Sequence, residues 1–220
     1  MRKILFLLSV FAFSAIPAFS QGVIEQILKR MDAHQKSLKS LQADMMMTRF
    51  SVQFGGTYTK EGTLNFLTQP QKDEYWLAID SVKPTSENFL IVKNEYLIYS
   101  PNLKIAYTGK TTDSQKNILM IFSNLSKKNL KADYLIKYIG QEKVNNEIFT
   151  WKLEITPKQL KIFKTLELWI DKDGMAIQSK ATENNGDWTN VMMSNIQKNA
   201  VIHAKVFTIK LPKDTKIIKN

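Results

Sequence analysis

The spacing of apolar residues changes from a helical to a strand pattern soon after residue 41. Over residues 22–41, apolar side chains recur three or four positions apart, and charged side chains fill the positions between them. This spacing predicts an amphipathic helix that packs one apolar stripe against a core. The stripe consists of Ile24, Ile27, Leu28, Met31, Leu38 and Leu41.

Beyond that helix, the chain is a series of short segments in which aromatic or β-branched residues alternate with polar ones. Gly, Pro or Asn residues separate many of the segments, and the gaps are too short for crossover helices, so antiparallel hairpins are expected. The predicted strands are 43–54, 58–67, 75–79, 88–92, 96–100, 104–107, 134–139, 148–155, 163–170, 176–182, 189–196 and 206–210. A sheet of about eleven antiparallel strands tends to curl, which gives it one concave face.

A second helix is predicted between two of these strands. Thr112 and Gln115 have the spacing of a capping box, and Asp113 is an alternative cap. The apolar block 118–122 and Leu125 make this helix apolar almost all round, so it must be covered or must offer apolar surface to a partner. The two helices are therefore the segments available to fill the concave face. No interior linker is visible, and the chain from 21 to 220 is predicted to form a single domain.

Residues 1–20 have the features of a secretory signal peptide. Two basic residues precede an apolar run over 4–13, and the small-residue site 18–20 predicts cleavage before Gln21. The apolar run is shorter than the roughly 20 residues that span a bilayer. The chain has no cysteine, so it has neither a disulfide nor a lipid-anchoring cysteine. We therefore expect an exported, unanchored protein.

The chain is strongly basic, with a formal net charge of +11 that falls to +9 without the two basic residues of the signal peptide. Almost all of the basic residues are lysines, since Arg2, Arg30 and Arg49 are the only arginines. Proteins that read nucleic acids favour arginine for bidentate contacts with bases, so no nucleic-acid partner is expected. A solvated, lysine-rich surface explains the charge, and attraction to anionic lipid surfaces or acidic partners is the alternative.

Residues for catalysis or metal binding are sparse, and neither an enzyme nor a cofactor is predicted. His34 and His203 are the only histidines, and neither belongs to a cluster with the spacing of metal ligands. Nucleotide-binding loops and the nucleophile elbow are missing from the sequence. The run 171–174, Asp-Lys-Asp-Gly, resembles the start of a calcium loop. Its glycine comes too early and no closing Glu follows, so a hairpin turn is predicted instead.

Methionine is abundant, with nine residues that include the runs 45–47 and 192–193. Its flexible side chain fills irregular gaps in a core, and it also adapts to irregular apolar partners. These runs are compatible both with core filling and with a deformable wall for lipid chains.

Several motifs occur in an order that resembles a known family. They are Leu38-Lys39-Ser40-Leu41-Gln42-Ala43, Gly62-Thr63-Leu64-Asn65-Phe66 followed by Pro70, Tyr96-Leu97-Ile98-Tyr99-Ser100-Pro101, and Val206-Phe207-Thr208-Ile209-Lys210-Leu211-Pro212. With the first helix and the signal peptide, they make residues 22–218 similar to the periplasmic outer-membrane lipoprotein carriers of the LolA type. The resemblance implies an α+β fold, in which an unclosed antiparallel β-barrel of about eleven strands forms a half-barrel and helices cover a hydrophobic cavity.

The resemblance also implies a function and its partners. A carrier of this type takes acylated lipoproteins from an inner-membrane ABC transporter that releases them, and it delivers them to an outer-membrane lipoprotein receptor. Exposing a chain of roughly sixteen carbons to water costs on the order of 12 kcal/mol, because each buried methylene contributes about 0.8 kcal/mol. A carrier that shields the chain in the periplasm is therefore needed. We expect it to act as a monomer.

Candidate residues follow from the resemblance and from alternation along the strands. The expected lipid-binding lining, for which ordinary core packing is the alternative, is Leu64, Phe66, Tyr75, Leu77, Ile79, Leu97 and Tyr99. The lid candidates on the second predicted helix are Ile118, Ile121, Phe122 and Leu125. Family members carry an arginine before the proline, where it latches the lid, and Gln69 occupies that position here. Because glutamine has no charge and fewer donors, a weaker latch is expected.

Other functions compete with the carrier function. A lipid- or lipoprotein-sensing domain of a periplasmic stress regulator uses the same fold, although such regulators carry a further C-terminal domain. The outer-membrane receptor of the pathway is itself a lipoprotein, which the missing cysteine disfavours. An exported enzyme would require polar groups that converge in the cavity.

Overall fold

The computed structural model describes residues 17–69, 74–111, 127–159 and 163–220. The first half of the chain forms α1 (Pro17–Ser37), β1 (Ser40–Ser51), β2 (Gly56–Gln69), β3 (Glu74–Lys83), β4 (Glu87–Val92), β5 (Glu95–Ser100), the short 3-10 helix η2 (Pro101–Leu103) and β6 (Ile105–Lys110). The second half forms α3 (Lys127–Asp133), β7 (Tyr134–Val144), β8 (Ile148–Pro157), β9 (Phe163–Ile170), β10 (Ala176–Glu183), β11 (Trp188–Lys198), the 3-10 helix η3 (Ala204–Phe207) and β12 (Lys216–Lys219).

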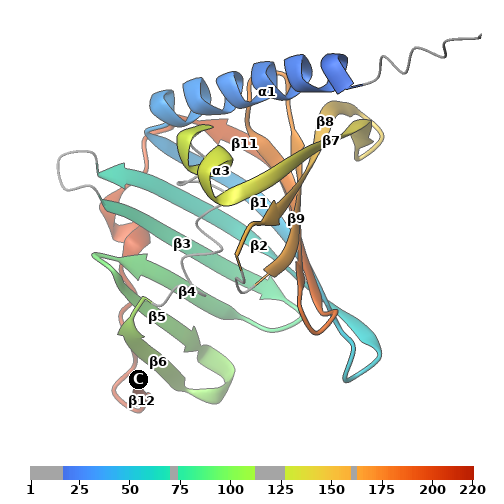
Figure 1. Cartoon of the computed structure of the whole chain (residues 1–220). Coiled ribbons are helices and arrows are strands. Elements are labelled where there is room, and N and C mark those ends of the chain that lie inside the picture. Colours follow the sequence, from blue (N-terminus) through green and yellow to red (C-terminus); the bar gives the residue numbers. More distant parts are fainter. Residues whose placement is uncertain (1–16, 70–73, 112–126, 160–162) are drawn as a thin grey trace, which may run out of the picture.

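The twelve strands belong to one open sheet, in the order β12-β6-β5-β4-β3-β2-β1-β11-β10-β9-β8-β7. Neighbouring strands run antiparallel except for β12, which pairs parallel with β6. The sheet curls but keeps β12 and β7 as separate edges (Figure 1). The prediction of one open antiparallel sheet is confirmed for β1–β11, whereas β12 adds a parallel pair and brings the number of strands to twelve instead of about eleven.

Helix α1 begins and ends earlier than the spacing of its apolar residues predicts. Leu38 and Leu41 lie beyond its last residue, Ser37, and Leu41 already belongs to β1. The side chain of Asn199 accepts a hydrogen bond from the backbone N–H of Lys39 at 2.7 Å and donates one to the Ser37 carbonyl at 3.2 Å. The end of the helix is thus held by a residue distant in sequence, which local spacing does not reveal.

The prediction of a strand at 206–210 is wrong. Residues Ala204–Phe207 form η3, and the last strand is β12, which adds to the edge of the sheet beside β6. The ring of Phe207 is buried and lies edge-on to Trp76, with 5.6 Å between the ring centroids. Because η3 packs over the face of β3 and β4, its backbone lies above the sheet and not beside a strand with which it could pair. Helix α3 was not predicted, and the helix predicted after Thr112 lies outside the described residues.

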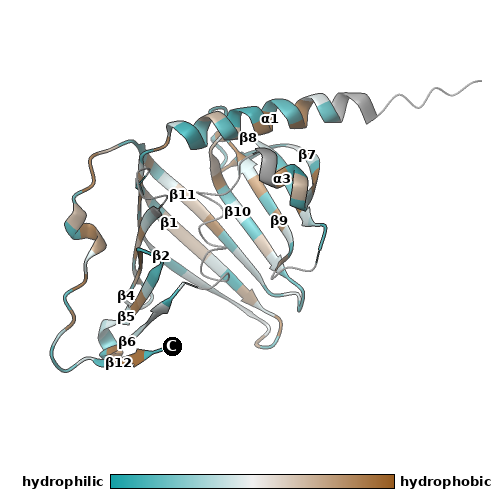
Figure 2. Ribbon diagram, turned by 60° about the vertical axis from the view of Figure 1, so that its left-hand side comes forward, coloured by the Kyte–Doolittle hydropathy of each residue, from teal (hydrophilic) through white to brown (hydrophobic). Residues whose placement is uncertain are grey.

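Two helices pack against one face of the sheet, which we call the inner face. The buried contact consists of Ile27, Leu28 and Met31 of α1, Leu130 of α3, and Leu153, Ile155, Leu166 and Leu168 of β8 and β9. The opposite face, which we call the outer face, carries η3 on β3 and β4. Figures 1 and 2 show η3 and α3 on opposite sides of the sheet. Each strand therefore has one face toward the helices and one face away from them.

The run 171–174 forms the hairpin turn between β9 and β10, as predicted. The Asp171 carboxylate accepts hydrogen bonds from the backbone N–H groups of Asp173 at 2.9 Å and Met175 at 2.8 Å. Gly174 has a φ of +90°, in the region that favours glycine. Within the described residues, no group of three His, Asp or Glu side chains is placed to hold a metal ion.

Candidate functional site

The first candidate site is the inner face of β1–β5. Cross-strand partners share a face of a sheet, so the register traces the inner face from the helices across the molecule. Leu168 packs with the helices and lies opposite Ser179, and Val191 and Met47 follow on β11 and β1. Alternate residues of β1 continue this face to Leu64 in β2. The apolar side chains of β2–β5 considered next therefore face the same side as α1 and α3.

Five of the seven predicted lining residues lie together on this face. Leu64 is opposite Ile79, and Phe66 is opposite Leu77. These four side chains are buried in one cluster. The half-buried ring of Tyr75 stacks on that of Phe66 with 6.2 Å between centroids, and burial raises the pKa of the Tyr75 phenol. The structure brings these residues together, and their contact with lipid stays a prediction.

Leu97 and Tyr99 lie on the outer face, so the expectation that they share this lining is wrong. Leu97 is opposite Leu90, and both belong to the cluster beneath η3. The turn 93–94, in which both residues have positive φ, joins β4 to β5 and sets their register. A shift of one residue moves every side chain to the other face, and alternation within β5 alone does not decide between the two faces.

Four inner-face residues on β4 and β5 were missed by sequence reasoning. Tyr96 is opposite Ile91, and Ile98 is opposite Phe89. Ile91 and Tyr96 are buried in the same cluster as Leu64 and its neighbours, and Phe89 and Ile98 pack against that cluster while half-buried. Counting outward from a two-residue turn at 93–94 would have paired these residues correctly.

The structure describes the predicted latch residue Gln69 but not the predicted lid. Gln69 is the last residue of β2, opposite Glu74, and its side chain is half-buried. The lid candidates Ile118, Ile121, Phe122 and Leu125 lie outside the described residues. The weak latch at Gln69 therefore stays a prediction.

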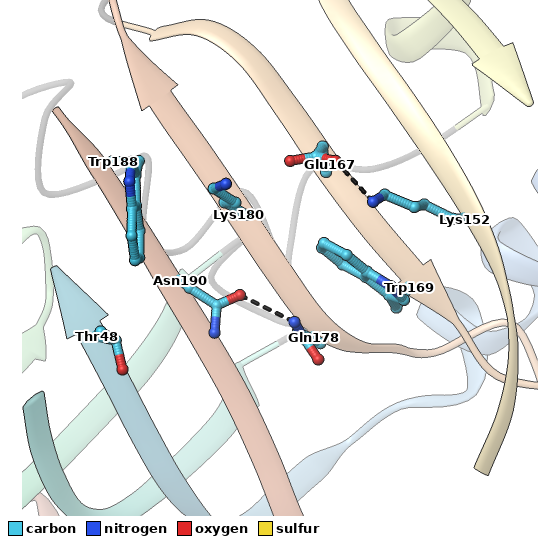
Figure 3. A pocket seen from close by; sticks show the side chains of 8 residues that line it. All are labelled: Thr48, Lys152, Glu167, Trp169, Gln178, Lys180, Trp188 and Asn190. Carbon is cyan, nitrogen blue, oxygen red and sulfur yellow. Dashed lines mark hydrogen bonds and ion pairs between the residues drawn. The ribbon is translucent and has the colours of Figure 1, made fainter. Parts of the chain in front are cut away.

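A second candidate site is a groove of about 360 Å³ on the outer face (Figure 3). It crosses β1 and β8–β11, and its lining is Thr48, Lys152, Glu167, Trp169, Gln178, Lys180, Trp188 and Asn190. Thr48, Asn190, Lys180 and Glu167 are successive cross-strand partners. Their chain neighbours Met47 and Leu168 face inward, so this outer groove and the apolar inner face lie on opposite sides of one sheet.

Charged and aromatic groups are combined at one end of the outer groove. Lys152 pairs with Glu167 at 2.9 Å and with Glu142 at 3.3 Å, and its ammonium lies 4.4 Å from the ring centroid of Trp169. The Trp169 indole N–H donates to Glu142 at 2.7 Å. Burial alone would lower the pKa of Lys152, but the two glutamates raise it. Lys152 is therefore a charged, fixed part of the wall.

The other end of the outer groove is built around Trp188. Its ring stacks on Phe50 with 5.8 Å between centroids, and the Lys180 ammonium lies 4.9 Å from the ring centroid. Because β11 lies between β1 and β10, Phe50 and Lys180 approach the indole from opposite sides. Between the two tryptophans, Gln178 donates a hydrogen bond to Asn190 at 3.0 Å (Figure 3).

Comparison with known families gives a match over most of the chain. The family model described as outer membrane lipoprotein carrier protein LolA matches residues 36–210. The chain belongs to the LolA family. The match contains β1–β11 entirely, so the inner face and the outer groove both belong to the LolA-type domain. No curated protein sequence matches the chain.

Solved structures share the fold of this LolA-family chain at low sequence identity. An uncharacterized conserved protein from Thermus thermophilus has a TM-score of 0.53 at 15% identity, over 90% of this chain and 99% of that one. MucB has a TM-score of 0.54 at 13% identity, over 86% of this chain and 63% of its own. LprF from Mycobacterium bovis has a TM-score of 0.51 at 12% identity, over 89% of this chain and 99% of its own. These similarities establish the fold of the LolA-family chain and nothing finer.

No helix in the described part of the LolA-family chain combines the length and apolar character needed to cross a membrane.

Proposed function

We propose that this protein is a periplasmic carrier that shields the acyl chains of lipoproteins on its inner face and shuttles them from the inner to the outer membrane. The observation that carries this proposal is the continuous apolar cluster across the inner face of β1–β5 in a member of the LolA family. Its partners would be acylated lipoproteins, the inner-membrane ABC transporter that releases them, and an outer-membrane lipoprotein receptor.

The composition of the inner face supports binding of an acyl chain. Met47, Phe89, Val191 and Ile98 pack against the buried cluster and keep part of their surface accessible. An acyl chain buried here recovers about 0.8 kcal/mol per methylene, the same contribution that it loses on leaving the membrane. The flexible thioether of Met47 can adapt to chains of different shape. A surface that matches the membrane without greatly exceeding it allows both uptake and release.

Export is part of the proposal and has a direct test. We expect cleavage before Gln21, so the protein recovered from the periplasmic fraction should have the intact mass of residues 21–220. A protein that keeps residues 1–20, or that fractionates with the cytoplasm, would contradict a periplasmic carrier.

The carrier function is tested by a matched pair of isoleucine substitutions. Ile98→Glu places a carboxylate on the inner face, whereas Ile217→Glu places one on β12 at a side chain that is 53% exposed. Ile98→Glu should strongly reduce binding of a fluorescent fatty-acid probe, because a charge among acyl chains costs several kcal/mol unless it is neutralised. Ile217→Glu should bind the probe like the original protein. Equal binding by both variants would exclude the inner face as the acyl-chain site.

Native mass spectrometry of the protein from cells separates a carrier from a simple lipid binder. A carrier should co-purify with triacylated or diacylated lipoprotein and transfer it to vesicles that contain the outer-membrane receptor. A protein that binds lipid or lipoprotein but never transfers it would instead be a sensing domain. A protein that co-purifies with neither, while the transporter is active, would overturn the proposal.

A further inference from the structure

We infer that the outer groove binds a saccharide, at a site separate from the acyl-chain surface on the inner face. The groove lies across β1 and β8–β11 on the side of the sheet that faces away from α1 and α3. Its volume of about 360 Å³ is near the lower end of the roughly 300–1,000 Å³ of small-ligand sites. A ligand of one or two sugar rings matches that size.

Two indole rings border the groove and provide apolar walls. Trp188 is half-buried, with the ring of Phe50 stacked on one side and the long, flexible side chain of Lys180 over the ring. Trp169 forms the other wall and donates a hydrogen bond to Glu142, but the residue is only 7% exposed and the Lys152 ammonium lies over its ring. Trp188 is therefore the ring available for stacking. Pyranose rings present patches of C–H groups, which carry partial positive charge and pack on the negative face of an aromatic ring. The Trp188 wall therefore suits the face of a sugar ring that displaces the Lys180 side chain.

The floor between the walls carries paired hydrogen-bonding groups. The bond from Gln178 to Asn190 uses Nε2 of the first amide and Oδ1 of the second. Among the described residues, it leaves Oε1 of Gln178 as an acceptor and Nδ2 of Asn190 as a donor. Sugar hydroxyls both donate and accept, so neighbouring hydroxyls can bond to both amides. Thr48 and Lys180 add a hydroxyl and an ammonium to the same floor.

Other ligand classes fit this lining less well. An acyl chain would cover Gln178, Asn190 and Thr48 without offering them hydrogen bonds, which is unfavourable for each group. A nucleic acid would require several cations along its phosphates, whereas the groove offers two lysines, of which Lys152 is paired with glutamates. The combination of aromatic walls with neutral amides and a hydroxyl favours a saccharide.

The test is binding of the purified protein to an array of bacterial glycans, followed by NMR titration with the best-binding disaccharide. We expect saturable binding that shifts the indole N–H signals of Trp188 and Trp169. The indole of Trp151 is an internal reference, because it packs in the inner-face cluster with Arg30 4.0 Å above its ring. Its signal should not move.

Substitutions in the outer groove show whether the disaccharide binds there. Trp188→Ala and Asn190→Ala should each weaken binding about tenfold or more, since each removes one stacking surface or one hydrogen-bonding group. The matched control Phe54→Ala removes an aromatic ring that is 83% exposed in the β1–β2 turn, and it should bind like the original protein. Asn190→Ala keeps the test informative if Trp188→Ala does not fold. Failure of every glycan to bind, or binding that survives Asn190→Ala, would overturn the inference.

Discussion

At Gly174 the chain passes beneath α1 with no room for a side chain. A Cβ atom at this position would lie 2.3 Å from the backbone carbon of Arg30, and the φ of +90° is itself unfavourable for other residues. Gly174→Ala should therefore destabilise the fold by about 2–4 kcal/mol, from backbone strain and from the displacement of α1. Urea unfolding measures the change in free energy.

The control is Gly22→Ala within α1 itself. A Cβ atom at Gly22 meets nothing within 4 Å, and Gly22 is the second residue after the expected cleavage site, so alanine should change the free energy of unfolding by less than about 0.5 kcal/mol. If Gly174→Ala were as stable as the original protein, the close contact between the turn and the helix would be wrong.

His34 makes the stability of the fold depend on pH. Burial, and then the charge of Lys198, lower the pKa of this imidazole below 6.5, while Asp171 and Asp173 oppose the shift. The unfolded chain therefore binds more protons than the folded one just below pH 6.5. The contribution of His34 to the free energy of unfolding is therefore complete above that pH. It is lost as the pH falls through the lowered pKa of the folded protein. His34→Asn should flatten this dependence.

The same pH dependence in His34→Asn and the original protein would mean that burial of His34 does not control it.

Phe207 is the buried aromatic residue of η3, the short helix that packs on the outer face of the sheet. Phe207 in η3 is buried against Ala78 and Leu90, edge-on to Trp76. Phe207→Ala should cost about 3 kcal/mol and lower the melting temperature by roughly 5–10 °C. Val201→Ala removes a side chain that is 90% exposed just before η3, and it should change neither quantity. A stable Phe207→Ala variant would show that η3 contributes little to the fold.

Most of the strands could be predicted from the local alternation of residues, whereas the remaining elements depend on contacts between residues far apart in the sequence. Hairpin strands such as β9 and β10 could be predicted, because alternation and a turn at 171–174 lie together in the sequence. The short helix η3, where a strand was expected, could not be predicted, because the residues of β3 and β4 that bury Phe207 are far away in the sequence. The face of β5 was assigned wrongly since alternation fixes which residues share a face, but only the register shows which face is inner.

The candidate sites were predictable to different degrees for the same reason. Five residues of the inner face lie on β2 and β3, which are neighbours in sequence and in which apolar and polar residues alternate clearly. The outer groove collects side chains from five strands, and Thr48 and Lys152 are far apart along the chain. Its polar and charged residues, taken alone, are typical of solvent-exposed strand positions. Only the order of strands in the sheet brings them together.

The whole molecule places two different surfaces on the two faces of one sheet, so we expect them to bind their ligands independently. Ile98→Glu should lose the fatty-acid probe and keep the disaccharide, because Ile98 points to the inner face of β5. Asn190→Ala should show the reverse, because its side chain lies on the outer face of β11. Titrating both variants with each ligand, alone and in the presence of the other, measures the coupling. An affinity for one ligand that changes more than about tenfold when the other is bound would show that the faces communicate through the sheet.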